Sequence, residues 1–357
     1  MAVRVMLVDD STIVRGLIAR ALTVTPDIEI VATAFNGAMA IPIAQEHQPD
    51  IIILDIEMPE MDGITALPKL LQAAPKTKII MASTLTVRNA GISMQALELG
   101  ASDYVAKPSA RLPEELEIFY RELREKIHAL AGARTQRTRS SVVSAPPVAS
   151  SANSITLLSP HAPLAAPVKE LAIASSTGGP QALLKLFSDI KGKLNHLPIF
   201  LTQHMPPTFT SILAEHLSKA GERTCMEAKN GDEVKPGHAY VAPGDYHMLV
   251  VQENGKAVLR INQGPPINFC RPAADPMFQS LSKVYGKHLL AVILTGMGQD
   301  GFEGAKTIVA GGGSVIAQDE ATSVVWGMPK AVATNNLCRA VLPLPGIPGY
   351  LLQHIGN

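Results

Sequence analysis

Acidic and polar side chains recur at the ends of apolar runs in the N-terminal part of the sequence. Asp9 and Asp10 close the first run, Asp55 closes the third, and Ser83 and Lys107 follow the fourth and fifth. If the runs are parallel strands, these groups meet at one edge of a sheet. Clustered carboxylates suit Mg²⁺, and a carboxylate held there can attack a phosphoryl group. A single aspartate often only caps a helix. Here five polar or charged side chains lie at the ends of four apolar runs, and this set favours a phosphoryl-transfer site.

A second set of reactive groups lies in the C-terminal part. Ser176, His204 and Asp300 each lie just after an apolar run, so parallel strands would gather them as the nucleophile, base and orienting acid of an acyl-transfer triad. An unperturbed histidine has a pKa near 6.5, so we expect His204 to act as a base close to neutrality. Each group alone has a simpler use as a cap or a solvated side chain. The nucleophile-elbow pattern G-x-S-x-G is only half met, because position 174 is alanine.

The same C-terminal part permits a different interpretation. Gly296, Gly298 and Gly301 satisfy G-x-G-x-x-G after one apolar run, and Asp319 follows 18 residues later. This spacing is typical of a dinucleotide-binding fold, in which the acid binds a ribose hydroxyl. Only 38 residues remain after Asp319, and this hypothesis gives the serine and histidine no role. A dinucleotide-dependent oxidoreductase therefore stays open as the alternative to acyl transfer.

In the N-terminal part, predicted strands and helices alternate along the chain, and these elements must position the carboxylates, Ser83 and Lys107. Short apolar runs predict strands, and the segments between them carry helical patterns. Five strands with helical crossovers imply a parallel sheet covered on both faces. Pro42 and Pro68 lie inside two of the helical segments, so we expect late helix starts or kinks there. The predicted strands are Val3–Val8, Glu29–Ala34, Ile51–Asp55, Lys78–Ala82 and Asp103–Ala106, and the predicted helices are Thr12–Leu22, Ala38–His47, Ile64–Leu71, Ala90–Leu99 and Glu114–Leu130.

The C-terminal part repeats this alternation and predicts a doubly wound α/β domain. Strands are predicted at Glu170–Ala174, Pro198–Thr202, His288–Thr295 and Ser314–Gln318, with a helix at Pro180–Ser188. In such a fold, function gathers at the carboxyl ends of the strands.

A segment of different composition separates the two parts. Residues 134–167 contain 7 Ser, 5 Pro and 6 Ala, and no Asp, Glu or Gly. A tract of this kind cannot bury enough apolar surface to offset its ordering entropy, so it predicts a linker. We therefore expect a first domain over residues 1–125, a helix end and flexible linker over 126–167, and a second domain over 168–357.

Overall composition excludes several classes of protein. The 357 residues carry 31 basic and 31 acidic side chains and only 4% aromatics, which argues against a general nucleic-acid binder. Three widely spaced cysteines form neither a zinc-binding pattern nor a disulfide framework. The first apolar run is too short for a signal peptide, and no stretch is long enough to span a membrane. A cytoplasmic protein of two domains is expected.

The first 125 residues resemble the receiver domain of two-component response regulators. The resemblance rests on VDDS at 8–11, ILDIEMPEMDG at 53–63, MAST at 81–84 and DYVAKP at 103–108. It implies a flavodoxin-like fold, phosphorylation that requires Mg²⁺, and a cis bond between Lys107 and Pro108. The roles that it implies are Asp55 as phosphoacceptor and metal ligand, Asp10 as a direct metal ligand, Glu57 as a ligand through its backbone carbonyl, Asp9 as a supporting acid, Ser83 and Tyr104 as switch residues, and Lys107 as a partner of the phosphoryl group.

The C-terminal part resembles the catalytic domain of the chemotaxis protein-glutamate methylesterases. The matching stretches are ASSTGGPQAL at 174–183, LTQHMPPTFT at 201–210, NFCRPAADPMF at 268–278, LTGMGQDG at 294–301 and AQDEATSVVWGMPKAV at 317–332. The resemblance implies Ser176 as nucleophile, His204 as general base and Asp300 as the acid that orients it. Met297 would supply a backbone N–H to the oxyanion. Of the adjacent serines, Ser176 is assigned because it directly precedes Thr-Gly-Gly.

The combined resemblance also implies an activity and its partners. A phosphorylation-regulated hydrolase would demethylate glutamate methyl esters of chemoreceptors and deamidate their glutamines during adaptation. A chemotaxis histidine kinase would be the phosphodonor. No cofactor is expected at the esterase site, and no nucleic acid, membrane insertion or oligomer is expected.

Overall fold

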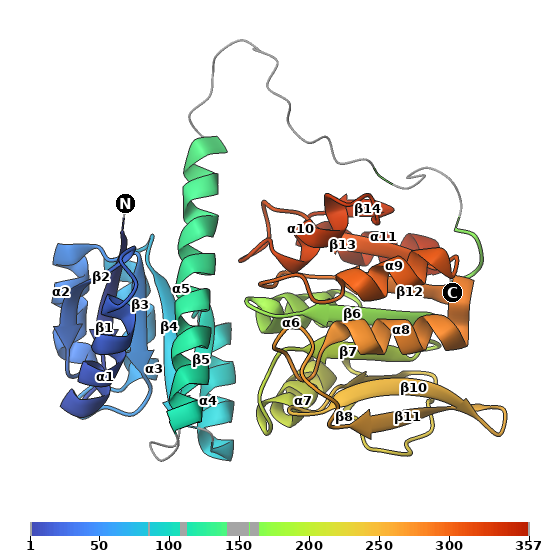
Figure 1. Ribbon diagram of the computed structural model, residues 1–357, viewed down its shortest axis with the longest axis horizontal. Coiled ribbons are helices and arrows are strands. Elements are labelled where there is room, and N and C mark those ends of the chain that lie inside the picture. Colours follow the sequence, from blue (N-terminus) through green and yellow to red (C-terminus); the bar gives the residue numbers. More distant parts are fainter. Residues whose placement is uncertain (1, 85, 108–112, 141–156, 158–163, 356–357) are drawn as a thin grey trace, which may run out of the picture. The chain divides into compact units, whose positions relative to one another are not determined.

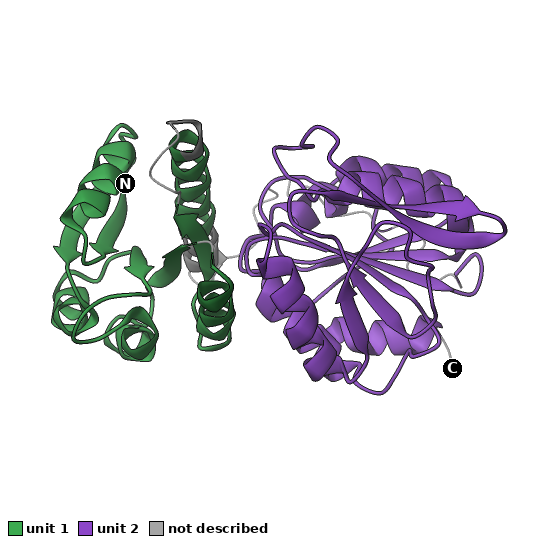
Figure 2. Ribbon diagram, turned by 90° about the horizontal axis from the view of Figure 1, so that it is seen from below, with its two compact units in different colours: residues 1–143 green, residues 144–357 purple. Residues whose placement is uncertain are grey.

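The computed structural model describes residues 2–84, 86–107, 113–140, 157 and 164–355. The chain divides into two compact units, Met1–Val143 and Ser144–Asn357 (Figure 2). None of the helices in these described ranges is long and apolar enough to cross a membrane.

The first unit is a five-stranded parallel sheet with helices on both faces (Figure 1). Its strand order, β2-β1-β3-β4-β5, is that of flavodoxin-like folds. Helix α1 packs on α5, and α2 packs on α3, with α4 beside α3. The elements are β1 (Val3–Val8), α1 (Thr12–Thr23), β2 (Ile28–Ala34), α2 (Gly37–His47), β3 (Ile51–Asp55), α3 (Gly63–Ala73), β4 (Lys78–Thr84), α4 (Val87–Glu98), β5 (Asp103–Lys107) and α5 (Pro113–Ser140).

Local sequence explains where the helices of this unit begin. The side chains of Ser11, Asn36, Asp62 and Thr86 each accept a hydrogen bond from a backbone N–H three residues later. Such caps satisfy donors that have no partner within the first helical turn. Every strand of the sheet begins within one residue of its predicted start.

Several expectations for this unit and the linker after it need correction or cannot be tested. Helices α2 and α3 do not start late, because each begins at a side-chain cap and continues past its proline with the loss of one backbone donor. Helix α5 continues to Ser140 rather than ending at Leu130, since the Arg and Gln residues there favour helix. The bond between Lys107 and Pro108, and most of the predicted linker, lie outside the described residues.

The second unit is a seven-stranded parallel sheet in the order β14-β13-β12-β6-β7-β9-β8. Helices α6, α7 and α11 pack together on one side, and α8, α9 and α10 pack together on the other (Figures 1 and 2). The elements are β6 (Glu170–Ser175), α6 (Gly179–Asp189), β7 (Ile199–Gln203), α7 (Phe209–Gly221), β8 (Thr224–Glu227), β9 (His238–Val241), β10 (His247–Glu253), β11 (Lys256–Asn262), α8 (Ala274–Tyr285), η1 (Gly286–His288), β12 (Leu289–Ile293), α9 (Phe302–Ala310), β13 (Ser314–Gln318), α10 (Met328–Ala333), β14 (Ala340–Leu342), η2 (Leu344–Gly346) and α11 (Ile347–Ile355).

The central strands of this sheet are fully buried, as parallel strands covered on both faces should be. The predicted doubly wound α/β class is therefore confirmed.

The strand order also creates a switch point. The chain moves from β6 to β7 on one side, and β12 later pairs with β6 on the other side. In open α/β sheets, the crevice beyond such a point is where ligands bind.

The sequence did not predict an antiparallel hairpin, β10–β11, which packs against α8. The segment that follows β11, residues 264–271, lies next to the switch point, where Cys270 contacts His204.

Candidate functional site

The carboxylates of the first unit meet at one edge of its sheet. One oxygen each of Asp9, Asp10 and Asp55 lies within 4.8 Å of the others. Asp9 and Asp55 are buried, and Asp10 is exposed. All three offer hard oxygen ligands, and the exposed side leaves room for the water molecules that Mg²⁺ retains. The donor set therefore fits this ion.

Lys107 is the counter-ion of this cluster. Its Nζ lies 2.6 Å from Asp9 Oδ2 and 2.7 Å from Asp55 Oδ1. Burial nevertheless raises the pKa of Asp55 to about 6, with Lys107 opposing the shift and Asp9 adding to it. A second cation would favour the ionised form of Asp55, which is the form that can attack a phosphoryl group.

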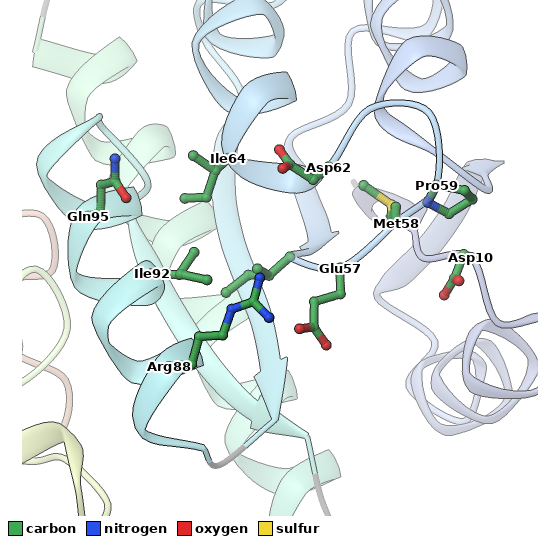
Figure 3. A pocket seen from close by; sticks show the side chains of 10 residues that line it. Asp10, Glu57, Met58, Pro59, Asp62, Ile64, Arg88, Ile92 and Gln95 are labelled. Carbon is green, nitrogen blue, oxygen red and sulfur yellow. The ribbon is translucent and has the colours of Figure 1, made fainter.

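A cavity of about 610 Å³ opens beside the carboxylates (Figure 3). Asp10 and Glu57 line it, together with Arg88 from α4. Glu57 is not among the three clustered carboxylates, which leaves its expected role as a carbonyl ligand untested. The guanidinium of Arg88 gives one wall of the cavity a positive charge, opposite in sign to the metal-site carboxylates.

The expected switch residues lie on β4, which pairs with β3, and on β5, the edge strand next to β4. Ser83 is buried, and its Oγ lies 3.0 Å from Oγ of Ser93 on α4. The ring of Tyr104 is also buried, with the Lys126 ammonium 5.1 Å from its centroid. The hydroxyl of Ser83 therefore links the end of β4, at the carboxylate edge of the sheet, to α4 by a hydrogen bond.

The three groups of the second set lie around the switch point of the larger sheet. Ser176 directly follows β6, His204 directly follows β7, and Asp300 lies between β12 and α9. The backbone N–H of His204 donates to the carbonyl of Ser175 at 3.2 Å. Two adjacent strand ends are thereby joined beside the serine.

His204 and Asp300 form a close pair. Nε2 of His204 lies 2.7 Å from Oδ2 of Asp300, and both side chains are largely buried. Backbone N–H groups of Ala274, Asp275 and Gly301 also donate to this carboxylate, at 2.5, 3.1 and 3.0 Å. Although burial opposes ionisation, these bonds and His204 hold the pKa of Asp300 below its ordinary value. Asp300 is thus an ionised carboxylate held in place beside the imidazole.

The other ring nitrogen of His204 has an unexpected neighbour. Nδ1 lies 3.4 Å from Sγ of Cys270. Burial would lower the pKa of His204, but Cys270 and Asp300 outweigh it and raise the pKa to about 10. This pKa lies above the unperturbed value near 6.5 on which the expectation for His204 rests, because Cys270 and Asp300 flank one ring.

The two adjacent serines have different surroundings. Ser175 is fully buried, and its Oγ donates to Oε1 of Gln203 at 2.7 Å. Ser176 is half-buried, and its Oγ has no hydrogen-bond partner among the described residues. Nε2 of Gln203 donates to the Ser176 carbonyl at 3.0 Å. The structure thus places Ser176 near the His204–Asp300 pair without a direct hydrogen bond to the imidazole.

The loop after β12 lies against Ser176. The N–H of Ser176 donates to the carbonyl of Thr295 at 3.1 Å. A Cβ at Gly296 would come within 2.9 Å of Ser176 Cβ and 2.5 Å of Met328 Sδ, so only glycine fits here. The backbone N–H of Met297 makes no hydrogen bond within the described ranges, which leaves a donor for a developing oxyanion.

The structure argues against the dinucleotide-binding interpretation, because Asp319, its expected ribose-binding acid, is engaged elsewhere. Oδ1 of Asp319 accepts hydrogen bonds from the N–H and the hydroxyl of Thr322, at 2.9 and 2.6 Å. Asp319 therefore closes a local turn, the ordinary use of an aspartate after a strand.

Sequence reasoning missed two residues of this site, Gln203 and Cys270. Gln203 immediately precedes His204, and its amide joins the two serines to β7. Cys270 lies within a stretch that carried the resemblance, but nothing in its spacing pointed to His204, which lies 66 residues earlier.

Comparison with known proteins finds a match for each of the two units. A family model described as CheB methylesterase matches residues 171–351, and one described as response regulator receiver domain matches residues 5–117. The protein-glutamate methylesterase/protein-glutamine glutaminase of Rhodopseudomonas palustris (strain BisB5) is 50% identical over 98% of this chain and 93% of its own. The protein-glutamate methylesterase/protein-glutamine glutaminase 1 of Paramagnetospirillum magneticum is 48% identical over 99% and 96%. The crystal structure of the Thermotoga maritima CheB methylesterase catalytic domain has 42% identity and a TM-score of 0.50, over 53% of this chain and 99% of that one.

The fold and these matches define a response regulator, in which a receiver domain is joined to an α/β enzyme domain. Both family models and relatives of nearly full length show that the chain belongs to the CheB methylesterase family.

Proposed function

We propose that this chain removes methyl groups from glutamate methyl esters of chemoreceptors, with Ser176, His204 and Asp300 as its catalytic triad. The observation that carries the triad is the His204–Asp300 pair, 2.7 Å apart beside a half-buried serine at the switch point of the sheet. The burial of Ser175 and its bond to Gln203 support Ser176 as the nucleophile.

The reaction is acyl transfer in two stages. Because Nε2 of His204 faces Asp300, Nδ1 is the nitrogen that takes the proton of Ser176 as Oγ attacks the ester carbonyl. The imidazolium then protonates the departing methoxide, and methanol leaves. Water, deprotonated by the same nitrogen, hydrolyses the acyl-enzyme to glutamate. The free N–H of Met297 would stabilise the oxyanion in both stages.

The same groups support glutamine deamidation. An amide carbonyl can replace the ester carbonyl, with ammonia leaving in place of methanol. Proton transfer from His204 matters more for this substrate, because an amine is the poorer leaving group.

Phosphorylation of Asp55 is the proposed control of the enzyme domain, with a chemotaxis histidine kinase as donor. Asp10, Asp55 and the carbonyl of Glu57 would hold Mg²⁺, which offsets the negative charge of the incoming phosphoryl group. Lys107, already 2.7 Å from Asp55, would bind a phosphoryl oxygen. Ser83 would turn from Ser93 toward the new group and so disturb α4. The protein would act as a monomer in the cytoplasm.

Substituting Asp55 by asparagine should abolish phosphorylation. Acetyl phosphate with Mg²⁺ should add the mass of one phosphoryl group to the wild-type chain, and none to Asp55→Asn, because an amide is not a nucleophile toward phosphorus. Intact-mass spectrometry measures both. Asp50→Asn, near the start of the same strand, is the matched control and should gain the group normally. A normal gain in Asp55→Asn would place the phosphoacceptor elsewhere.

Removing the receiver should raise the basal rate. If the unphosphorylated receiver restricts the site, a fragment that begins at Val168 should release methanol faster than the unphosphorylated full chain, and acetyl phosphate should not change its rate. Methanol release from methylated receptor, with and without phosphodonor, measures both. A fragment slower than the full chain would mean that the receiver activates rather than restricts.

A further inference from the structure

One hydrogen-bonding position of the catalytic imidazole is occupied by a group with no role in the triad. Nε2 of His204 is committed to Asp300 at 2.7 Å. Only Nδ1 remains to accept the serine proton, yet its neighbour at 3.4 Å is Sγ of Cys270. Among the described residues, no hydrogen bond joins Ser176 Oγ to either nitrogen.

The loop around Cys270 fixes the thiol in this position. Ile267 and Cys270 exchange two backbone hydrogen bonds of 3.0 and 2.9 Å. Arg271 then anchors the loop, because its guanidinium lies 2.6 Å from a carboxylate oxygen of Asp245. The one S–H proton of Cys270 has a second acceptor within reach, the carbonyl of Asn268 at 3.4 Å from Sγ. The thiol that contacts the imidazole therefore belongs to a loop held in place by backbone hydrogen bonds and an ion pair.

We propose that Cys270 is a positioning residue that holds the imidazole of His204 through Nδ1, competes with Ser176 for that nitrogen, and so restrains the esterase at neutral pH. The proposal rests on the triad proposed above. It gives a role in that reaction to a side chain that is neither nucleophile nor base.

The charges around the ring support this restraint. The titratable groups at the ring are Asp300, which follows β12, and Cys270, in the loop before α8. Asp275 on α8 is directed to Asp300 and to the N–H of Gly304 rather than to the imidazole. Although burial lowers the pKa of His204, Cys270 and Asp300 together raise it. Both neighbours thus favour the imidazolium, which cannot accept a proton.

The test compares pH profiles of methanol release in single variants. Cys270→Ala removes the competitor for Nδ1 and, with it, a neighbour that raises the pKa of His204, so its pH profile should shift to lower pH by at least about one unit. Because each unit changes the neutral fraction about tenfold, its rate at pH 7 should rise about tenfold. Cys270→Ser keeps a competing hydroxyl at Nδ1 but not the sulfur that raises the pKa of His204, so its pH profile should shift similarly while its plateau stays below that of Cys270→Ala. Cys225→Ala, at a half-buried thiol in β8, is the matched control and should leave the profile unchanged.

A readout independent of catalysis separates this proposal from the triad. The imidazole of His204, identified in NMR spectra by its loss in His204→Gln, should titrate at lower pH in Cys270→Ala than in wild type. An unchanged titration, or an unchanged or slower rate at pH 7 in Cys270→Ala, would overturn the proposed restraint. If Ser176→Ala kept its activity, the proposed triad would fail, but the NMR titration would still report the contact between Cys270 and His204.

Discussion

Replacing Ser176 by alanine should reduce methanol release by about 10⁶-fold, the loss in kcat seen when a triad serine is removed from a serine protease. The expected size follows from the chemistry, because without Oγ no acyl-enzyme forms. Any remaining rate would come from water and the oxyanion site alone. Methanol release from methylated receptor measures the rate, and a fluorophosphonate probe should label the wild-type chain but not Ser176→Ala.

The adjacent serine supplies a matched control. Ser175→Ala removes a buried donor to Gln203 Oε1, which should lower the free energy of unfolding by about 1–3 kcal/mol. Its hydroxyl is fully buried, so most of the activity should remain at a temperature where the variant is folded. If Ser175→Ala lost activity and Ser176→Ala kept it, the assignment within the pair would be reversed.

Much of the fold could be predicted from the sequence because parallel strands are buried on both faces. Ile51–Asp55 is an uninterrupted apolar run closed by one aspartate, and the structure buries every residue of it. Helix α5 was predicted too short, since its last residues are polar and lack an apolar period. The hairpin of β10 and β11 was missed because its strands are partly exposed and carry polar residues at their ends.

The site was predictable to the extent that it follows from strand ends. Parallel topology brings the residues after β6, β7 and β12 to one edge, so Ser176, His204 and Asp300 could be grouped before any coordinates. Topology does not say which ring nitrogen faces which partner. Cys270 reaches His204 from a loop that belongs to none of these strands, and it raises the pKa of the imidazole together with Asp300.

Replacing Asp300 by asparagine should lower the rate by about 10⁴-fold, as the same change does in a protease triad. The carboxylate accepts from Nε2 of His204 and from backbone N–H groups of Ala274 and Asp275. An amide cannot accept at every one of these positions. If its NH₂ group faces Nε2, the neutral ring carries its proton on Nδ1, which is the nitrogen that must accept from Ser176.

This variant separates the charge of Asp300 from its orienting role. Loss of the carboxylate removes one anion from the ring, so the pKa of His204 should fall and more of the ring should be neutral at pH 7. Charge alone would therefore make Asp300→Asn faster at neutral pH, as expected for Cys270→Ala, whereas the wrong tautomer makes it far slower. Asp319→Asn is the matched control, because that carboxylate closes a turn at Thr322 and should not affect the rate. A rate for Asp300→Asn within tenfold of wild type across the pH range would show that the imidazole needs no fixed acceptor at Nε2, and the triad would reduce to a serine and a histidine.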